Sequence, residues 1–414
     1  MSSFINFIKN VERDIDLGLE EFSIMQIKIK NFEQIAIIHN IKEFKAIGSL
    51  ILSSLYKALE NHVVNIYEYD KYYYSILKVV DQRALHILGK NIRDNLSENI
   101  NPELFFDVKV SCIVVSDICS IFNALSILAV DESYCEQRSF FHFFDAEQIL
   151  QRTREEYSLL GEIKKAIDEE TACFAFQPVI CCKTGKVSYH ECLLRLNDSH
   201  NKLVSAGRYI MLAEKYGYIT YVDKYVFEKA VKELQEFKDI IIAVNISSIA
   251  IQDKMISDYI LKLIKDSRVG SRMIVEITET AFNDNFHITK YFVDTAKSLG
   301  CQIALDDFGV GYTSFNYVRN YDIDIIKIDG CFIRGLDENL KNRALVEALI
   351  KTSEELGCKT VAEFVESSAI ASQLIDLKVD YMQGHFFSPA INQRPWNKEY
   401  GNSLKNYLAE SSLK

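Results

Sequence analysis

The sequence predicts an α+β domain followed by an α/β domain built as a TIM-type (β/α)8 barrel. From residue 173 onward, eight short apolar segments alternate with segments of helical spacing over roughly 240 residues, which is the pattern of such a barrel. Before residue 173, strands and helices follow one another less regularly, as in an α+β domain. The length of 414 residues is sufficient for two or three domains.

Composition indicates a globular protein that does not bind duplex nucleic acid. Hydrophobic residues make up 48% and charged residues 25% of the chain, which is enough apolar material for packed cores. The net charge of −11 argues against nonspecific duplex binding, because that depends on a basic surface. A small anionic ligand is still compatible with this charge, since bound metal ions invert the local field.

The ten cysteines and the first residues of the chain predict a cytoplasmic protein. No cysteine pair has Cys-x-x-Cys spacing, so we expect reduced, buried thiols and neither disulfides nor a zinc site. The first ten residues lack the long apolar core of a signal peptide. No apolar run approaches the ~20 residues of a membrane span.

Residues 1–145 are expected to form the α+β domain. Phe22–Ile29 alternates apolar and polar residues, which is typical of a half-buried strand. The tyrosine-rich stretch Val63–Leu77 predicts a hairpin around Glu68-Tyr-Asp70. The other expected elements are helices over 1–20, 41–60, 80–95 and 121–129 and strands over 106–115 and 140–144.

Residues 146–170 predict a charged helical connector between the two domains. An apolar stripe with 7-3-7 spacing runs along it, made by Leu150, Tyr157, Leu160 and Ile167. This stripe either packs within the molecule, which is the more usual role of a short amphipathic helix, or forms a short coiled-coil seam. Residues 401–414 are expected to be a C-terminal tail.

Residues 171–400 are expected to form the barrel. Its eight strands are predicted over 174–180, 189–196, 240–246, 273–278, 302–307, 323–328, 358–362 and 379–383. In such a barrel the chemistry lies at the C-terminal ends of the strands. Seven of the strands place an acid, amide or amine at or near that end: Glu191, Asn245, Glu276, Glu279, Asp306, Asp307, Lys327, Glu363, Glu366 and Gln383.

The stretch around Asp306 indicates a metal site. An apolar run delivers Asp306 and Asp307 into a loop that carries Gly309 and Gly311, where the backbone can approach a ligand closely. Divalent hard cations bind several oxygen ligands, and an acid shared by two ions gives a two-metal clamp suited to in-line phosphoryl displacement. The simpler alternative is a pair of aspartates that only caps a turn.

Two basic residues complete the predicted chemistry. Lys327 lies in a strand and would orient a bridging water or help to deprotonate it. Arg195 would hold a phosphate by charge-assisted hydrogen bonds.

These motifs resemble the EAL family of cyclic di-GMP phosphodiesterases over residues 170–400. Glu191-Cys-Leu-Leu-Arg195 resembles the Glu-Ala-Leu-x-Arg signature. The remaining motifs follow in order: Asn245-Ile-Ser247, Glu276-Ile-Thr-Glu279, Asp306-Asp-Phe-Gly-Val-Gly311, Lys327-Ile-Asp329, Glu363-Phe-Val-Glu366 and Gln383-Gly384. The resemblance implies hydrolysis of cyclic di-GMP to linear pGpG, with Mg²⁺ or Mn²⁺, in a homodimer formed through this domain. The alternative is a receptor that binds cyclic di-GMP without hydrolysing it.

The resemblance also implies a role for each site residue. The first metal would be held by Glu191, Asn245, Glu276 and Asp306, and the second by Asp306, Asp307 and Glu363. The implied catalytic residues are Lys327, which would contact the nucleophilic water, Asp307 and Glu363. The implied substrate contacts are Arg195, Gln177 and Gln383. Glu279 would steady the loop 308–314, which in the family couples dimerisation to activity.

Three residues depart from the family pattern without removing a ligand. Cys192 replaces an alanine of similar size, and Val310 replaces a common threonine in the loop. Phe364 replaces a common glycine directly after Glu363. Its bulk either lines the substrate pocket or shifts Glu363.

The layout of residues 1–145 resembles a GGDEF (diguanylate cyclase) domain, but its residues depart from the motifs of that family. Glu68-Tyr-Asp-Lys-Tyr72 takes the place of the Gly-Gly-Asp/Glu-Glu-Phe turn, and Lys28-Ile-Lys-Asn-Phe32 that of Asp-x-Asp-x-Phe. Lysine cannot ligate magnesium, and Tyr69 fills a position where glycine allows phosphate to approach. We therefore expect a degenerate domain without cyclase activity, serving either as a structural or dimerising module or as a nucleotide-binding regulator.

Overall fold

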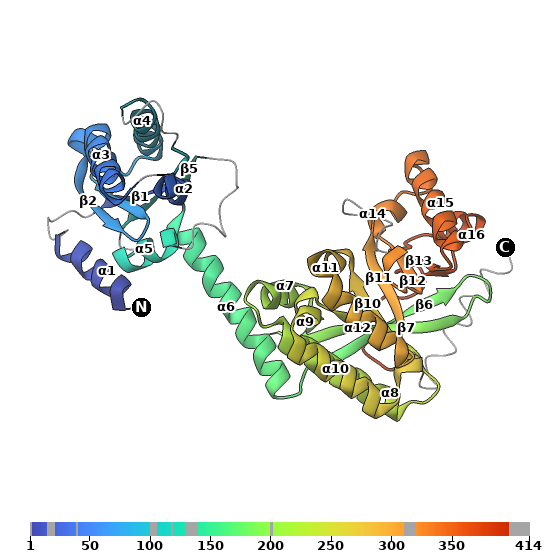
Figure 1. Ribbon diagram of the computed structural model, residues 1–414. Helices are drawn as coiled ribbons and strands as arrows, with labels where there is room; N and C mark the ends of the chain where they lie inside the picture. Colours follow the sequence, from blue (N-terminus) through green and yellow to red (C-terminus); the bar gives the residue numbers. More distant parts are fainter. Residues whose placement is uncertain are drawn as a thin grey trace. The chain divides into compact units, whose positions relative to one another are not determined.

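The chain folds into two compact units, Met1–Glu156 and Tyr157–Lys414 (Figure 1). The computed structural model describes residues 2–14, 21–38, 40–99, 106–116, 119–129, 140–198, 202–309 and 319–396. Each unit has its own sheet and its own apolar clusters. Within these ranges, no helix combines the length and the apolar character that a membrane span requires.

The first unit is built on a five-stranded sheet with the order β2-β3-β1-β4-β5. The central strand β1 (Phe22–Ile29) pairs antiparallel with β3 (Tyr72–Leu77) and β4 (Val108–Val115). The outer strands are β2 (Val63–Tyr69) and β5 (Phe141–Phe144). All residues of β1 except Lys28 are buried, because helices cover both faces of the sheet.

Two helices cover each face of this sheet. Apolar residues of α3 (Ile41–Leu59) and α4 (Gln82–Asn99) pack on one face, and those of α1 (Ser2–Asp14) and α5 (Ile121–Ala129) pack on the other. The side chain of Asn40 accepts hydrogen bonds from the first turn of α3, which fixes where that helix begins. A short helix, α2 (Phe32–Ile38), was not predicted from the sequence.

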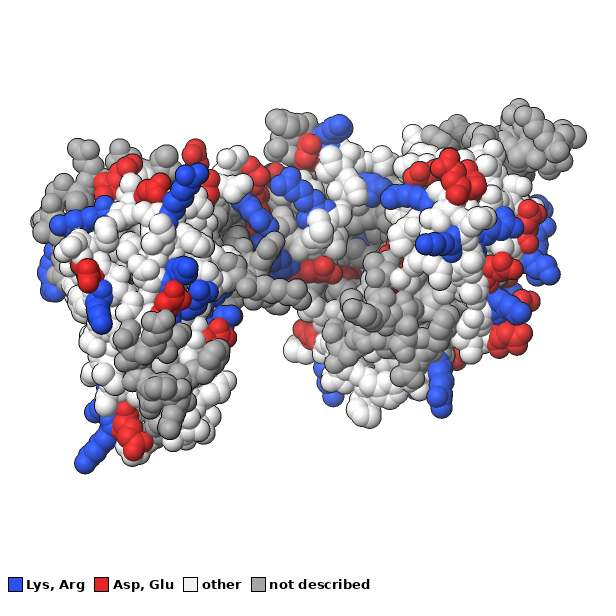
Figure 2. Space-filling view, turned by 90° about the horizontal axis from the view of Figure 1, so that it is seen from above, with Lys and Arg blue, Asp and Glu red and all other residues white. Residues whose placement is uncertain are grey.

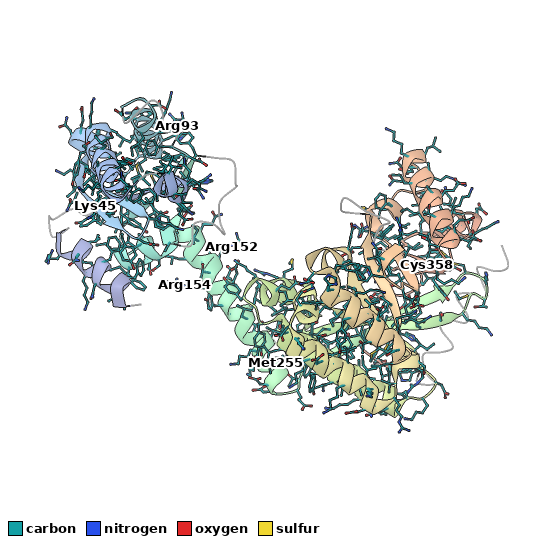
Figure 3. The ribbon with its side chains drawn as sticks, in the orientation of Figure 1. Lys45, Arg93, Arg152, Arg154, Met255 and Cys358 are labelled. Atoms are coloured by element: carbon teal, nitrogen blue, oxygen red, sulfur yellow. The ribbon has the colours of Figure 1, made fainter. Side chains whose placement is uncertain are left out.

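The helix α6 (Ala146–Asp168) contributes to the apolar clusters of both units. Leu150 packs against a cluster of the first unit, and Ile167 packs against the main cluster of the second. Both ends of the predicted stripe are therefore used for packing within a unit, whereas Tyr157 between them is 61% exposed. Arg152, labelled on α6 in Figure 3, forms an ion pair with Glu156 at 2.9 Å.

The second unit contains the predicted eight-stranded barrel. Its strands are β6 (Cys173–Cys181), β7 (Val187–Asn197), β9 (Ile242–Ile246), β10 (Met273–Thr278), β11 (Gln302–Phe308), β12 (Ile325–Ile328), β13 (Lys359–Ala362) and β14 (Tyr381–Met382). Strand β6 pairs with both β7 and β14 and so closes the ring. A short strand, β8 (Leu203–Ser205), extends the sheet beyond β7.

One expectation for the barrel is wrong, because its first strand runs antiparallel to both neighbours. Strands β6 and β7 are joined by the turn 182–186, and no helix separates them. A parallel crossover needs about a dozen residues, so this short turn can only make a hairpin. The strict (β/α)8 alternation therefore begins after β7.

Helices surround the remaining strands, and the C-terminal residues cover the helix-free hairpin. The helices of this unit are α7 (Gly207–Lys215), α8 (Ile219–Glu236), α9 (Ser248–Gln252), α10 (Lys254–Ser267), α11 (Glu279–Asp284), α12 (Phe286–Ser298), α14 (Gly330–Ile333), α15 (Leu340–Glu355) and α16 (Ser368–Asp376). Ile391 forms a bridge with Phe176 of β6, and the Trp396 ring lies 4.6 Å from that of Phe176. Arg394 anchors this segment to α8 through Glu233 at 2.7 Å.

A set of apolar side chains fills the barrel interior below the ends of the strands. It takes one residue from each strand: Val179, Tyr189, Ala243, Ile274, Ala304, Ile325, Val361 and Tyr381. Side chains two positions apart on a strand point to the same face. The residues two positions nearer the rim therefore also face the barrel interior.

All nine cysteines in the described part of the chain are free, as predicted. Cys358, labelled at the start of β13 in Figure 3, is buried and donates its thiol hydrogen to the carbonyl of Ile323. The expectation of burial is wrong for Cys173 and Cys331, which are exposed. Cys173 is the first residue of β6, and Cys331 lies on the short helix α14, so neither position is fully covered.

Basic and acidic side chains are interspersed on the face of the molecule shown in Figure 2. No broad basic area is visible among the described residues on that face. This distribution agrees with the net charge of −11.

Gly270 should be intolerant of any side chain. A Cβ atom there would lie 2.1 Å from the carbonyl oxygen of Leu299, which is rigid backbone. We expect Gly270→Ala to lower the free energy of unfolding by about 1–3 kcal/mol through overpacking. Urea denaturation followed by circular dichroism measures this.

Gly161 on α6 provides the matched control. A Cβ atom there would meet nothing within 4 Å, so Gly161→Ala should raise stability by about 0.5–1 kcal/mol through better helix propensity. Equal effects of the two substitutions would contradict the predicted close approach at Gly270.

Candidate functional site

Eight polar side chains lie directly above the apolar set in the barrel. We call them the polar ring: Gln177, Glu191, Asn245, Glu276, Asp306, Lys327, Glu363 and Gln383. Each follows its apolar neighbour by two positions, except Gln177, which precedes Val179 because β6 runs in the opposite direction. The period of the strands therefore brings eight residues from distant parts of the chain to one end of the barrel.

Lys327 lies at the centre of the polar ring and is only 1% exposed. Its Nζ atom lies 2.9 Å from Glu276 Oε2, 3.0 Å from Asp306 Oδ1 and 2.9 Å from Glu363 Oε1. Burial alone would lower the pKa of this amine, but the surrounding carboxylates raise it well above its usual value. Lys327 is therefore a permanent cation that offsets part of the acidic charge.

The ionised form of Glu191 is stabilised by amides. Its two carboxylate oxygens accept hydrogen bonds from Asn245 Nδ2 at 3.0 Å and from Gln383 Nε2 at 2.5 Å. Gln383 Nε2 also donates to Gln177 Oε1 at 3.2 Å. Burial opposes ionisation of Glu191, but the charge of Lys327 and these hydrogen bonds outweigh it, so its pKa is lowered.

A local irregularity in β11 lets adjacent aspartates reach the same site. Neighbouring residues of a regular strand point to opposite faces. The register of β11 against β12 shifts between Leu305 and Phe308, and Asp307 has a φ of 55°. As a result, carboxylate oxygens of Asp306, Asp307 and Glu363 all lie within 4.8 Å of one another. This grouping has the size and chemistry of a divalent cation site.

Acidic charge in the site exceeds what Lys327 alone can offset. Burial and the charge of Glu191 raise the pKa of Glu276 well above its usual value, and burial raises the pKa of Glu363 to about 8. Glu276 Oε1 and Gln383 Oε1 are buried and have no hydrogen-bond partner among the described residues. Buried acceptors without donors are costly, and cations bound to oxygen ligands would relieve both problems. The residues present therefore fit divalent metal ions.

An open pocket of about 310 Å³ lies over the polar ring. The ring contributes its acidic floor, and its walls include Leu193, Arg334, Phe364, Glu366 and His385. Asn245 and Glu276 do not line the pocket but hydrogen bond to Glu191 and Lys327, which do. Arg334 and His385 were missed in the sequence analysis, since neither was part of a quoted motif.

Two predicted site residues lie apart from this pocket. Arg195 does not line it, and its Nη1 atom donates to the carbonyl of Leu194 at 3.0 Å. Glu279 is buried at the start of α11, and its Oε2 atom has no hydrogen-bond partner among the described residues. Most of the loop that Glu279 was expected to steady lies outside the described residues, including Val310 and Gly311.

Phe364, one of the departures from the family pattern, lines the pocket. The carboxylate of the preceding Glu363 contacts Lys327 and belongs to the acidic group with Asp306 and Asp307. A bulky ring in the pocket wall and an acidic floor are therefore present together.

Comparison with known proteins identifies one family and several relatives. The model of the EAL domain matches residues 161–390. Cyclic di-GMP phosphodiesterase PdeB of Shewanella oneidensis is 31% identical over 247 residues, which cover 58% of this chain and 29% of PdeB. The chain spans about a third of the length of the curated relatives that it matches first.

Two solved structures extend this comparison. The PaMucR phosphodiesterase in complex with c-di-GMP is 26% identical and has a TM-score of 0.53, with 56% of this chain and 97% of that chain covered. The S helix-GGDEF-EAL part of Vibrio cholerae LapD covers 92% of both chains with a TM-score of 0.53. Its 16% identity makes this last match a likeness of fold alone.

The metal-free protein should become less stable as the pH rises from about 4.5 to about 8. Glu363 has a pKa of about 8 in the folded chain and an ordinary value of 4.5, so the folded state binds its proton more tightly. The resulting stabilisation is complete below pH 4.5 and is lost as the pH passes 8. Urea denaturation in a chelator at pH 5 and pH 8 should show a loss of a few kcal/mol.

Replacement of Glu363 should reduce that slope. Glu363→Gln removes the titrating group, whereas Glu347→Gln changes an exposed acid of α15 and serves as the control. An identical pH dependence in wild type and Glu363→Gln would show that Glu363 is not the group responsible.

Proposed function

This chain belongs to the EAL domain family, and we propose that it hydrolyses cyclic di-GMP to linear pGpG with two bound divalent metal ions. The observation that carries the proposal is the polar ring, in which acids and amides surround a buried, charged Lys327. The names of the relatives support the same activity, since PdeB is a cyclic di-GMP phosphodiesterase and PaMucR was solved with c-di-GMP.

The same resemblance to the EAL family provides the proposed metal ligands. A first Mg²⁺ or Mn²⁺ would be held by Glu191, Asn245, Glu276 and Asp306, and a second by Asp306, Asp307 and Glu363. Two such ions, when bound, stabilise the attacking and the leaving oxygen of a phosphodiester together. The proximity of Asp306, Asp307 and Glu363 and the unpartnered oxygen of Glu276 support this assignment.

Lys327 would orient the attacking water and would not deprotonate it. Its amine already carries its proton, because three carboxylates lie within 3.0 Å and raise its pKa. A protonated amine donates hydrogen bonds and has no lone pair to accept a proton. Asp307 and Glu363 are the carboxylates that we place beside it in the catalytic set.

Two amide side chains of the polar ring would contact the substrate. Gln177 and Gln383 are linked by a hydrogen bond and line one part of the pocket, where amides can bind phosphate or base. We also propose Arg195, on the same strand as Glu191, as a substrate contact. It does not line the described pocket.

A cyclic di-GMP receptor without turnover is the second candidate function. The pocket over the polar ring fits it as well, since a ligand can bind there without being hydrolysed. The complete ligand set with Lys327 favours the enzyme, because binding alone does not require both Asp306 and Asp307 beside a buried lysine.

We further propose that the first unit is a GGDEF-like domain without cyclase activity that modulates the second. The order of its strands and the fold likeness to LapD support the relationship. Lys28 pairs with Lys109 and Tyr72 on the neighbouring strands, and Lys71 lies 3.6 Å from Glu33. Lysines thus occupy positions where the resemblance to the GGDEF family implies acids. We also propose that the chain forms a homodimer through its EAL domain and that it is cytoplasmic.

Purified full-length protein with Mn²⁺ should convert cyclic di-GMP to pGpG and should lose this activity in a chelator. Asp306→Ala should lower the rate by about 10²–10³-fold or more, because it removes charge that stabilises the transition state. Chromatography of the nucleotides measures both effects.

Asp294→Ala is the control for this experiment. Asp294 lies on the surface of α12 and pairs only with Lys290 of the same helix among the described residues, so turnover should not change. Tight binding of cyclic di-GMP without conversion would favour the receptor. Full turnover by Asp306→Ala would refute the metal assignment.

A further inference from the structure

One wall of the pocket is formed by an aromatic ring stacked on a cation. The Phe364 ring and the Arg334 guanidinium carbon lie 4.3 Å apart, measured to the ring centroid. Both residues line the pocket above the acidic floor. We call this pair the Phe–Arg wall. It brings two planar groups, a ring and a guanidinium with its positive charge, to a pocket whose floor is acidic.

Stability does not explain why Phe364 occupies this position. Its φ of 51° lies in the left-handed region, where glycine is the unstrained residue and a bulky side chain costs about 1 kcal/mol or more. Its side chain is 45% exposed, so the burial gained in return is small. A strained, exposed aromatic residue directly after Glu363 is better explained by contact with a ligand.

Gly330 and Glu366 contact the two members of the wall. The ring packs against Gly330, where a Cβ atom would lie 2.3 Å from Phe364 Cδ2. Arg334 Nε lies 3.6 Å from Glu366 Oε1, in an exposed ion pair beside the ring. The absence of a side chain at Gly330 thus makes room for the ring.

We propose that the Phe–Arg wall is a nucleobase subsite, which stacks one purine of a dinucleotide and sets its guanidinium charge beside a phosphate. The inference deepens the proposed function and rests on it. Aromatic rings and arginine planes both stack on nucleobases, and arginine also binds phosphate by charge-assisted hydrogen bonds. Metal ions on the acidic floor would bind the scissile phosphodiester. The wall would therefore contribute to the affinity for the substrate and to the preference for a particular nucleobase.

Steady-state kinetics with cyclic di-GMP and Mn²⁺ tests the subsite. Phe364→Gly and Arg334→Ala should each raise KM about tenfold or more, as the loss of one stacked base predicts, and leave kcat nearly unchanged. Phe364→Tyr keeps the stacking ring and should behave as wild type. Arg343→Ala removes an arginine of α15 that does not line the pocket and is the matched control.

The dependence on Mn²⁺ separates a subsite from an indirect effect. If Phe364 acted only by positioning Glu363, Phe364→Gly would lower kcat and raise the Mn²⁺ concentration needed for half-maximal rate. That result would overturn the proposal, as would an unchanged KM in both Phe364→Gly and Arg334→Ala.

The test also distinguishes failure of the subsite from failure of the proposed function. If wild type did not hydrolyse cyclic di-GMP, calorimetric titration of cyclic di-GMP into the same variants would decide the question. A dissociation constant raised about tenfold in Phe364→Gly and Arg334→Ala would support the subsite in a receptor. Equal affinity in all variants, or no binding by wild type, would overturn it.

Discussion

The buried ammonium group of Lys327 is the interaction on which the site depends. Three carboxylates from three different strands lie within 3.0 Å of it. Desolvated charges of one sign repel strongly, so a cation is needed for such a group of acids to remain ionised at the end of a barrel. One lysine offsets only part of the charge, which leaves buried acceptors such as Glu276 Oε1 without donors. The same imbalance that limits the stability of the metal-free chain makes the site suitable for divalent ions.

Strand geometry converts this chemistry into a single site. An apolar side chain from each barrel strand fills the interior, and a polar side chain two positions away forms the next level of the same interior. The packed lower level fixes the strands and hence the positions of the charged groups above it. Strand β11 adds one irregularity, where the positive φ of Asp307 brings a second adjacent carboxylate to the site. Regular strand pairing stabilises the barrel, and the irregularity in β11 adds the carboxylate of Asp307 to the site.

The two units carry different charged residues on their central strands. In the second unit, acids gather around a cation in an enclosed, rigid barrel end. In the first, lysines stand at the positions where the resemblance leads us to expect acids, and Lys28 and Lys109 are neighbours across two central strands. Phe364 illustrates a third case, in which a residue is retained at a cost in backbone energy beside the site. Each of these features departs from what stability alone would select, and each is therefore informative about function.

The sequence by itself determined the order of the eight barrel strands and nearly all residues of the polar ring. Period-two apolar segments end in acids or amides in the barrel, so Glu191, Asp306 and Lys327 could be assigned to one rim before any contact was known. Only the tertiary structure decided that β6 runs antiparallel, that Asp307 lies near Asp306 and Glu363, and that Arg334 stacks on Phe364 beside Gly330. The reason is physical. The spacing of apolar residues along a segment indicates which face of that helix or strand is buried, and this spacing involves only residues that are neighbours in the chain. Strand direction, backbone irregularity and contacts across a pocket depend on residues far apart in sequence, and their energies are fixed only when the chain is packed.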